Sequence, residues 1–255
     1  MNNNDFKKTI LTNKELKIYQ ILIKKIRNWL RQKVNSAKAN GIALGISGGI
    51  DSATLAKICD EEFQEKAHFY YFKTKQDTYT EDHINQLQKV LKNKIEIIDL
   101  TNEYKLIINN LKLEKRIAKI NTKSRLFMTS IYALSQDKNC LVLGTDNYDE
   151  FYLGYFTKYG DGGCDLLPFA NIKKSDVYAM ANILNIPKSI IDKKPSANLE
   201  EEQYDEDELG FSYDQFEKWL IDKNSVSKEV QSKIEKAHKL TDHKRDRIPV
   251  GPKLK

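Results

Sequence analysis

One segment decides which architecture this chain can adopt, Gly41-Ile42-Ala43-Leu44-Gly45-Ile46-Ser47-Gly48-Gly49-Ile50-Asp51-Ser52. Its first six residues are wholly apolar, which is typical of a buried strand in a parallel sheet. From Ala53 to Ile58, apolar side chains return at helical spacing. The segment therefore predicts a strand, a tight glycine loop and a helix, in that order.

The loop between the strand and the helix has the composition of a phosphate site. Gly48 and Gly49 let the backbone approach an anion closely, and the following helix directs free N–H groups at it. Ser47 and Ser52 add hydroxyl donors. A carboxylate would repel phosphate unless a cation lay between them, so we interpret Asp51 as a Mg2+ ligand.

Two common nucleotide loops do not fit this segment. A Walker A loop requires a Lys that is absent here, and the glycines do not follow the dinucleotide-binding pattern. The pattern SGGxDS instead resembles the pyrophosphatase loop of the N-type ATP pyrophosphatases, which hold the β- and γ-phosphates of ATP and cleave between α and β. The resemblance implies that ATP binds along Gly45, Ile46, Ser47, Gly48, Gly49, Ile50, Asp51 and Ser52.

Strand and helix patterns alternate on both sides of this loop. Strands are predicted over 67–72, 95–100 and 140–144, and helices over 16–34, 84–91, 101–113 and 122–134. Such alternation implies right-handed crossovers and a doubly wound parallel sheet flanked by helices, a Rossmann-like α/β fold. The resemblance narrows this fold to the adenine nucleotide alpha hydrolase type. Ligands of such sheets bind beyond the carboxyl ends of the strands.

A second strand end also carries polar side chains. Thr145-Asp146-Asn147-Tyr148-Asp149-Glu150 follows the strand over 140–144. If that strand lies beside the first one, Asp51 and one of the three carboxylates in this run can share a metal held against triphosphate oxygens.

The length and composition of the chain suit one large α/β domain or such a domain with a helical appendage. The chain has 255 residues, 40% of them hydrophobic, without a membrane-spanning stretch or a signal peptide at Met1, so we expect a cytoplasmic protein without membrane contact. Three widely spaced cysteines predict reduced thiols rather than disulfides or structural zinc. The net charge of +6 comes from interleaved charges. We therefore predict a solvated basic surface and no nucleic-acid partner.

The last third of the chain is predicted as helices joined by polar segments. A helix opens near Asn171 with Ser175 as its cap, and two more follow over 211–220 and 226–240. The acidic run within 199–210 predicts a mobile loop, and 243–255 an irregular basic tail. We expect the N-terminal and C-terminal helices to cover one sheet face or to pack on a second subunit.

Several segments taken together resemble the NAD synthetases, one family of this group. Besides the loop, they are Asn121-Thr122-Lys123-Ser124-Arg125, Leu143-Gly144-Thr145-Asp146 with Glu150, Phe156-Thr157-Lys158-Tyr159-Gly160-Asp161-Gly162-Gly163-Cys164-Asp165, Asn171-Ile172-Lys173-Lys174, Lys194-Pro195-Ser196-Ala197-Asn198-Leu199, Glu208-Leu209-Gly210-Phe211-Ser212-Tyr213-Asp214 and His243-Lys244-Arg245. The resemblance spans roughly residues 20 to 248, and FTKYGDGG is its most diagnostic part.

The resemblance implies a ligase that makes NAD. It would amidate nicotinic acid adenine dinucleotide, or deamido-NAD, with ammonia and ATP, through an adenylated carboxylate, in the last step of NAD biosynthesis. AMP and pyrophosphate would leave. No segment is long enough for a glutaminase domain, so we expect residues 1–255 to form a single synthetase domain that uses free ammonia or ammonia from a separate subunit.

The resemblance also implies roles for particular residues. Asp51 and Glu150 would coordinate Mg2+, while Thr145, Lys174 and Ser196 would contact ATP. Contacts to deamido-NAD would come from Arg125, Lys158, Asp165, His243 and Lys244. The residues expected to carry catalysis are Asp51, Lys158 and Lys174, with either Lys174 or Lys158 stabilising charge at the α-phosphate. The acidic loop would be a lid.

The resemblance also implies that the protein is a homodimer. The interface candidates are the long amphipathic segments Leu16 to Val34 and Thr122 to Leu134. Some positions depart from the family pattern: Tyr71 to Asp77 differs from its usual Arg-Leu-Pro-Tyr-like segment, Ile120 replaces a Gly, and Ser196 stands where Thr is common.

Two other functions compete with this interpretation. One is a related pyrophosphatase, such as a tRNA-modifying ligase or the synthetase part of a GMP-type enzyme, against which FTKYGDGG argues. The other is a nucleotide-binding module without turnover. Binding alone does not need Asp51 and Glu150 aimed at a metal beside Lys174, which argues against that second function.

Overall fold

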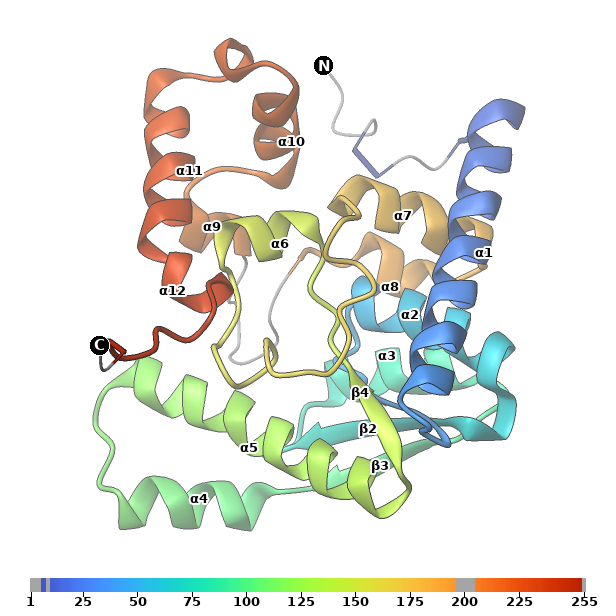
Figure 1. Cartoon of the computed structure of the whole chain (residues 1–255), viewed down its shortest axis with the longest axis vertical. Helices are drawn as coiled ribbons and strands as arrows, with labels where there is room; N and C mark the ends of the chain where they lie inside the picture. The colour runs from blue at the N-terminus through green and yellow to red at the C-terminus, as the bar shows by residue number, and fades with distance from the viewer. Residues whose placement is uncertain (1–5, 8–9, 196–204, 254–255) are drawn as a thin grey trace.

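A computed structural model of the chain describes residues 6–7, 10–195 and 205–253. Its described part contains one parallel sheet of four strands in the order β3-β2-β1-β4 (Figure 1). The strands are β1 (Gly41–Gly45), β2 (Ala67–Lys73), β3 (Ile95–Asp99) and β4 (Cys140–Leu143). The predicted Rossmann-like α/β fold is thereby confirmed.

The strand order places the glycine loop at the point where the winding reverses. From β1 the chain moves to β2 on one side, whereas β4 pairs with β1 on the other, with Leu44 opposite Leu143. The carboxyl ends of β1 and β4 are therefore neighbours, as a shared site for Asp51 and the acidic run requires. Such a reversal opens a crevice for a ligand.

One face of the sheet is covered by helices from both halves of the chain. They are α1 (Asn13–Ser36), α2 (Ile50–Phe63), α3 (Thr78–Gln88), α7 (Lys174–Ile183) and α8 (Lys188–Asp192), with the 3-10 turn η1 (Gln64–Lys66) after α2. Helix α1 begins with a capping box in which Thr12 and Glu15 bond each other's backbone N–H groups. The main core lies here, with Leu30, Leu55 and Phe69 fully buried.

The opposite face is covered by α5 (Arg116–Asp137), beside which lies α4 (Thr101–Asn110). Ile131 of α5 packs on Tyr70 and Val142 of the sheet in a second, smaller core. Helix α4 has no buried residue. Helices on both faces make the sheet doubly wound, as predicted.

The C-terminal helices build a cluster of their own against α6 (Tyr148–Leu153). They are α9 (Asp205–Leu209), α10 (Tyr213–Ile221), α11 (Lys228–Leu240) and α12 (Asp242–Arg245), with the 3-10 turn η2 (Lys223–Ser225) after α10. Leu153, Phe216 and Ile234 are buried together there. These helices therefore hold α6 and cover neither sheet face, whereas α1 does cover one (Figure 1).

Three local predictions need correction. Lys173 is the N-cap of α7, and Ser175 instead donates from Oγ and its backbone N–H to the Glu217 carboxylate, at 2.6 and 2.9 Å. The second half of the acidic run forms α9, because tyrosines that lie beside it in space donate hydrogen bonds to its carboxylates. Residues 196–204 lie outside the described part. The start of the predicted basic tail forms α12, because Lys244 bonds to the loop after α6.

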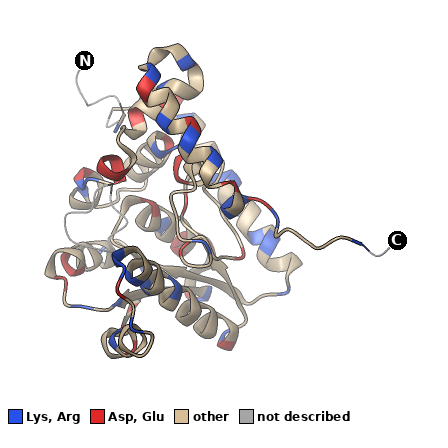
Figure 2. Cartoon of the chain, turned by 90° about the vertical axis from the view of Figure 1, so that its left-hand side faces the viewer, with Lys and Arg blue, Asp and Glu red and all other residues tan. Residues whose placement is uncertain are grey.

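Charged residues of both signs are mixed along the chain. Lys and Arg are interspersed with Asp and Glu over the ribbon (Figure 2). None of the helices in the described ranges combines the length and the apolar character needed to cross a bilayer. Cys59, Cys140 and Cys164 are all free thiols.

Candidate functional site

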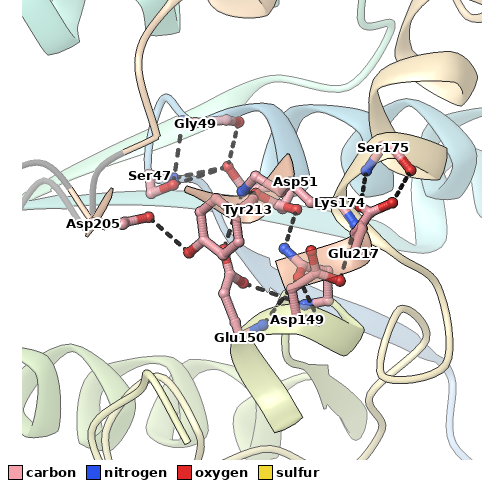
Figure 3. Close-up of polar contacts among 12 residues, drawn as sticks. Ser47, Gly49, Asp51, Asp149, Glu150, Lys174, Ser175, Asp205, Tyr213 and Glu217 are labelled. Carbon is pink, nitrogen blue, oxygen red and sulfur yellow. Dashed lines mark hydrogen bonds and ion pairs between the residues drawn. The ribbon is translucent and has the colours of Figure 1, made fainter. Parts of the chain in front are cut away.

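The loop after β1 forms an open cradle whose polar groups bond one another. Gly48 has a φ of 74°, and a side chain there would be pressed against Thr80 of α3, so glycine is needed. The Ser47 and Ser52 hydroxyls lie 3.1 Å apart, and the Gly49 N–H donates to Ser47 Oγ at 3.3 Å (Figure 3). Gly49 caps α2 without a side-chain bond, so the positive end of that helix faces the cradle.

Asp51 and Glu150 converge on one buried ammonium group. Lys174 Nζ lies 2.5 Å from Asp51 Oδ2 and 3.0 Å from Glu150 Oε1 (Figure 3). Asn147, the cap of α6, donates from Nδ2 to Asp51 Oδ1 at 2.9 Å. The starts of three helices, α2, α6 and α7, therefore aim these groups at a single point beside β1 and β4.

Burial and charge pairing together set the protonation of the Lys174 amine and the Glu150 carboxyl. Burial works to lower the pKa of Lys174, but the Asp51 and Glu150 carboxylates raise it well above its usual range, so the amine stays protonated. Burial raises the pKa of Glu150 to about 8 against the attraction of Lys174. Asp51 and Glu150 face one ammonium, and a second cation bound there would favour loss of the proton that burial keeps on Glu150.

Two further buried carboxyls lie beside this group. Burial, followed by the repulsion of Glu217, raises the pKa of Asp149 to about 9. Burial also raises the pKa of Asp146 well above its usual range, and its Oδ2 has no hydrogen-bond partner among the described residues. Of the three carboxylates in the acidic run, Glu150 is the one that meets Asp51.

A cavity of about 250 Å³ lies directly beyond the strand ends. Its walls come from the glycine loop, the end of β2, one side of α5, the loop after β4 and the start of α9. The predicted site residues that line it are Gly45, Ile46, Ser47, Gly49, Asp51, Thr145, Glu150 and Lys174. These residues, far apart in sequence, surround one space.

The loop after α6 closes another side of the cavity and is fixed to α5. Ser124 Oγ donates to Asp161 Oδ1 at 2.6 Å, and the Asp161 N–H donates back to that hydroxyl at 2.9 Å. Thr157 Oγ1 donates to Asn121 Oδ1 at 3.0 Å. Two of the diagnostic sequence segments thus hold each other in place.

The residues predicted to contact the dinucleotide gather outside the cavity lining. Arg125 Nε donates to the Lys158 carbonyl at 3.2 Å, and Lys158 Nζ donates to the His243 carbonyl. Lys244 Nζ donates to the carbonyls of Gly154 and Phe156, at 2.7 and 2.6 Å. The basic C-terminal helix α12 is thereby joined to the loop after α6.

Asp165 lies apart from this basic group. Its carboxylate accepts from the Val142 N–H at 2.8 Å and from the Tyr132 hydroxyl at 3.1 Å, at the end of β4. Gly48, Ile50 and Ser52 support the cradle without lining the large cavity, and Ser196 lies outside the described residues.

Sequence reasoning missed part of the site. Tyr213 is fully buried against the cluster and donates to Asp205 Oδ2 at 3.1 Å, while Tyr155 donates to Glu208 Oε2 at 2.6 Å (Figure 3 shows the first pair). Asp205 lines the cavity. Tyr213, shortly after the acidic run, was the available signal, whereas Tyr155 is distant in the sequence. The two tyrosines dock α9 over the site.

Known proteins share both the sequence and the fold of this chain. The family model described as NAD synthase matches residues 22–248. An "NH(3)-dependent NAD(+) synthetase" of Mycoplasmopsis pulmonis is 45% identical, over 91% of this chain and 90% of its own length.

Two solved structures match almost the whole chain as well. The NMN synthetase of Francisella tularensis has a TM-score of 0.84 at 33% identity, covering 92% of this chain and 99% of its own. The NH3-dependent NAD synthetase of Campylobacter jejuni, solved with a nitrate ion, has a TM-score of 0.79 at 25% identity, with the same coverage of both chains.

Proposed function

The chain belongs to the NAD synthase family, and we propose from this membership that its cavity joins ammonia to the nicotinate carboxylate of deamido-NAD at the expense of ATP. The observation that carries this proposal is the convergence of Asp51, Glu150 and Lys174 beside an open phosphate cradle. A single bound triphosphate could reach the cradle and this cluster at once. The reaction is a C–N ligation that yields NAD, AMP and pyrophosphate.

ATP lies with its phosphates in the loop between β1 and α2. Backbone N–H groups at the start of α2 and the hydroxyls of Ser47 and Ser52 bind phosphate oxygens, which needs only a rearrangement of the bonds that these groups make to one another. Thr145 at the end of β4 and Ser196 contribute further ATP contacts. Such a cradle supplies positive partial charge without a protein nucleophile.

Mg2+ fits the two carboxylates in this site. Asp51 and Glu150 already direct oxygens at one cationic position, and hard oxygen ligands are what Mg2+ prefers. Bound there beside the triphosphate, the metal would neutralise phosphate charge. Asn147 holds Asp51 in orientation, and the capping box of α6 holds Glu150.

The chemistry proceeds in two displacements. An oxygen of the nicotinate carboxylate attacks the α-phosphorus, the bond from that phosphorus to the bridging oxygen breaks, and pyrophosphate leaves. Ammonia then attacks the carbonyl carbon of the acyl adenylate, AMP leaves with the shared oxygen, and a proton is lost from nitrogen. Of the two predicted lysines, Lys174 lines the cavity and Lys158 does not, so Lys174 stabilises the negative charge that develops at the α-phosphate.

Deamido-NAD binds where α5, the loop after α6 and α12 meet. Its two phosphates and the cationic side chains of Arg125, Lys158 and Lys244 are of complementary charge, and His243 adds a ring nitrogen to the same group. In the unliganded chain the two lysines bond to backbone carbonyls, which keeps this region assembled. Asp165 extends the substrate contacts toward the end of β4.

Water must be kept from the acyl adenylate, since hydrolysis would waste ATP. The lid predicted from the acidic run is represented among the described residues by α9, whose Asp205 lines the cavity, while residues 196–204 lie outside the described part. Tyr213 and Tyr155 hold α9 through their hydroxyls. Limited proteolysis with and without ATP plus deamido-NAD tests the lid, and equal cleavage within 199–210 in both would contradict it.

A direct assay tests the function. The purified chain is incubated with ATP, Mg2+, deamido-NAD and ammonium, and we expect NAD, AMP and pyrophosphate in equal amounts. Omission of any one reactant should abolish all three products. AMP release that depends on RNA would instead indicate a tRNA-modifying ligase, and no release in any mixture would indicate a binding module.

A second substrate deserves comparison because a close structural match, from Francisella tularensis, is named an NMN synthetase. Such an enzyme amidates the mononucleotide instead of the dinucleotide. The same assay with nicotinic acid mononucleotide decides between them. We expect the higher kcat/KM with deamido-NAD, since relatives named NAD synthetases reach 45% identity.

The enzyme acts as a cytoplasmic homodimer. A second copy covers α4 and the first turn of α5, where Leu106, Leu111 and Ile117 are each at least 60% exposed. Large apolar side chains exposed together on adjoining helices favour association. The predicted candidate α1 has its buried stripe packed on α2 and α7, and of its large apolar side chains Ile18 and Ile21 stay about half exposed.

A further inference from the structure

One aromatic residue in the described part of the chain adopts a backbone conformation that suits glycine. Tyr159, in the loop after α6, has a φ of 61°. Bulky residues are uncommon at positive φ, because the side chain crowds its own backbone. The other non-glycine residues with positive φ in the described ranges all carry polar side chains, and they are Lys38, Gln64, Lys112, Asn139 and Asn185. Tyr159 therefore needs an explanation that these residues do not.

The loop itself imposes this conformation on Tyr159. The Gly160 N–H donates to the Thr157 carbonyl at 2.8 Å, so Tyr159 is the third residue of a β-turn. Where the third residue of such a turn has positive φ, glycine or asparagine is the usual choice. The turn is seated on α5, since a side chain at Gly160 would clash with Ser124. Any residue at position 159 must accept the same φ.

Packing does not explain the tyrosine either. Tyr159 is 52% exposed, and its ring belongs to none of the hydrophobic clusters formed by the described residues. Asparagine or glycine at this position would fit the backbone better and would leave no ring in water. A costly conformation that neither the turn nor the core requires of a tyrosine points to a ligand.

The ring lies beside the cations that the proposed function assigns to the substrate phosphates. Lys158 Nζ lies 5.5 Å from the centre of the Tyr159 ring, and Arg125 Nε donates to the Lys158 carbonyl at 3.2 Å. The next residue, Gly160, lines the large cavity, whereas Tyr159 does not. The ring therefore lies outside the cavity and next to this basic group.

This position fits the end of deamido-NAD that does not react. The nicotinate carboxylate must reach the α-phosphate inside the cavity, where Lys174 is one of the lining residues. The two phosphates join the nicotinate end to the adenine end, so a substrate whose phosphates lie at Arg125 and Lys158 has its adenine farther from the cavity. Adenine is planar, and stacking on an exposed aromatic ring is a common protein contact for such a base.

We propose that Tyr159 stacks on the adenine base of deamido-NAD and so favours the dinucleotide over the mononucleotide. This inference rests on the proposed function, which it deepens by naming a residue that sets substrate specificity. The adenine is remote from the reacting carboxylate, so Tyr159 takes no part in the chemistry. Nicotinic acid mononucleotide has no adenine and gains nothing from the ring.

The test compares Tyr159→Asn with the wild type in the full chain. Binding is measured by titration calorimetry with Mg2+ and α,β-methylene-ATP present, so that the ATP site is filled. ADP-ribose carries the adenine and both phosphates, and its affinity should fall by about tenfold in the variant because the stacking is lost. The affinity for nicotinic acid mononucleotide should stay the same. In the NAD assay, KM for deamido-NAD should rise by a similar factor, while kcat and KM for ATP stay unchanged.

Thermal stability separates this role from a structural one. Asparagine tolerates positive φ, so Tyr159→Asn should melt at or above the wild-type temperature. Tyr159→Phe keeps the ring and should bind ADP-ribose like the wild type. The matched control, Lys38→Asn, relieves a positive φ in the same way just before β1, at the end of that strand opposite the cavity. It should change no affinity.

Equal binding of ADP-ribose by Tyr159→Asn and the wild type would overturn the proposal, as would an equal loss of affinity for nicotinic acid mononucleotide. A change of mass in light scattering would overturn it too, by assigning Tyr159 to a contact between two copies of the chain. Failure of the wild type to make NAD would contradict the proposed function instead, whereas the ADP-ribose comparison does not depend on turnover.

Discussion

At the scale of single residues, the site depends on a lysine that is buried only because two carboxylates hold it. Lys174 is 2% exposed, and its ammonium would be costly to bury without Asp51 and Glu150. The sequence marks this lysine by the family motif. The pairing itself became visible only when α7 was placed beside α2 and α6.

Replacing Lys174 by Met should affect stability as well as activity. The variant leaves two carboxylates without their counter-charge, so we expect a loss of about 3–5 kcal/mol in the free energy of unfolding, measured in urea. NAD formation should fall by about a hundredfold or more, because charge at the α-phosphate loses a partner. Mg2+ should raise the unfolding midpoint of the variant more than that of the wild type.

The control for this change is Lys173→Met. Lys173 precedes Lys174, is 39% exposed and pairs with Glu217 at 3.6 Å. Lys173 is itself in contact with solvent, and Ser175 still donates two hydrogen bonds to the buried Glu217 carboxylate, so the loss should be about 0–1 kcal/mol. Equal NAD formation in Lys174→Met and wild type would rule out the role given to Lys174.

Asp149 should make stability depend on pH. Its pKa is raised to about 9 by burial and Glu217, so the folded chain holds a proton that the unfolded chain loses near pH 4. The unfolded state binds fewer protons between these values, and stability therefore falls as the pH rises through that window. Asp149→Asn has no proton to lose, so it should not show this decrease in stability, and it keeps an acceptor oxygen at the same place.

Thermal melts at pH 5, 7 and 9 check this expectation. The melting temperature of Asp149→Asn should rise relative to that of the wild type as the pH rises. The shift should be about 2–4 °C for each kcal/mol of difference in unfolding free energy. A constant difference between the two proteins across the three pH values would show that Asp149 titrates normally.

At the scale of elements, the C-terminal helices act as the support of the loop after α6. Phe216 and Trp219 of α10 pack with Leu153 of α6, and His238 of α11 stacks on Tyr152 at 4.0 Å between ring centres. Thr241 Oγ1 donates to the Leu153 carbonyl at 3.0 Å. Substrate contacts from α12 therefore depend on this apolar cluster.

Phe216→Ala should loosen this support. Phe216 is fully buried, and such a truncation costs about 3–5 kcal/mol. Hydrogen exchange should quicken in α10–α12 and around 154–163, with β1 and β2 unchanged, and KM for deamido-NAD should rise. Ile221→Ala, on the same helix but 82% exposed, should do none of this. Equal acceleration of exchange in the sheet would mean that the cluster is not a separate element.

At the scale of the whole molecule, the surface left uncovered by the fold indicates where a second copy binds. The double variant Leu106→Lys with Leu111→Lys puts two charges into the proposed interface. Its mass by light scattering should halve, because like charges would face each other across a symmetric contact.

The matched control lies on α1, where Ile18 and Ile21 are 52% and 55% exposed. Ile18→Lys with Ile21→Lys should leave the mass unchanged. The reverse outcome, a dimer that survives the α4 change and dissociates with the α1 change, would place the interface on α1 instead.

Much of the molecule followed from the sequence alone. The apolar segment before Ser47 and the alternation after it indicated a parallel α/β sheet because buried parallel strands need both a continuous apolar run and a crossover helix. The same local logic located the phosphate cradle, since two glycines before a helix expose N–H groups to an anion.

Only the tertiary structure decided which distant groups share one space. Asp146, Asp149 and Glu150 are equivalent as a pattern, but the start of α6 aims Glu150 at Asp51 and buries the other two. Likewise, α9 forms because Tyr155 and Tyr213 reach its carboxylates from elsewhere in the chain. Local sequence determines secondary-structure propensity and the spacing of side chains. Burial and charge pairing depend instead on how elements far apart in the chain pack together.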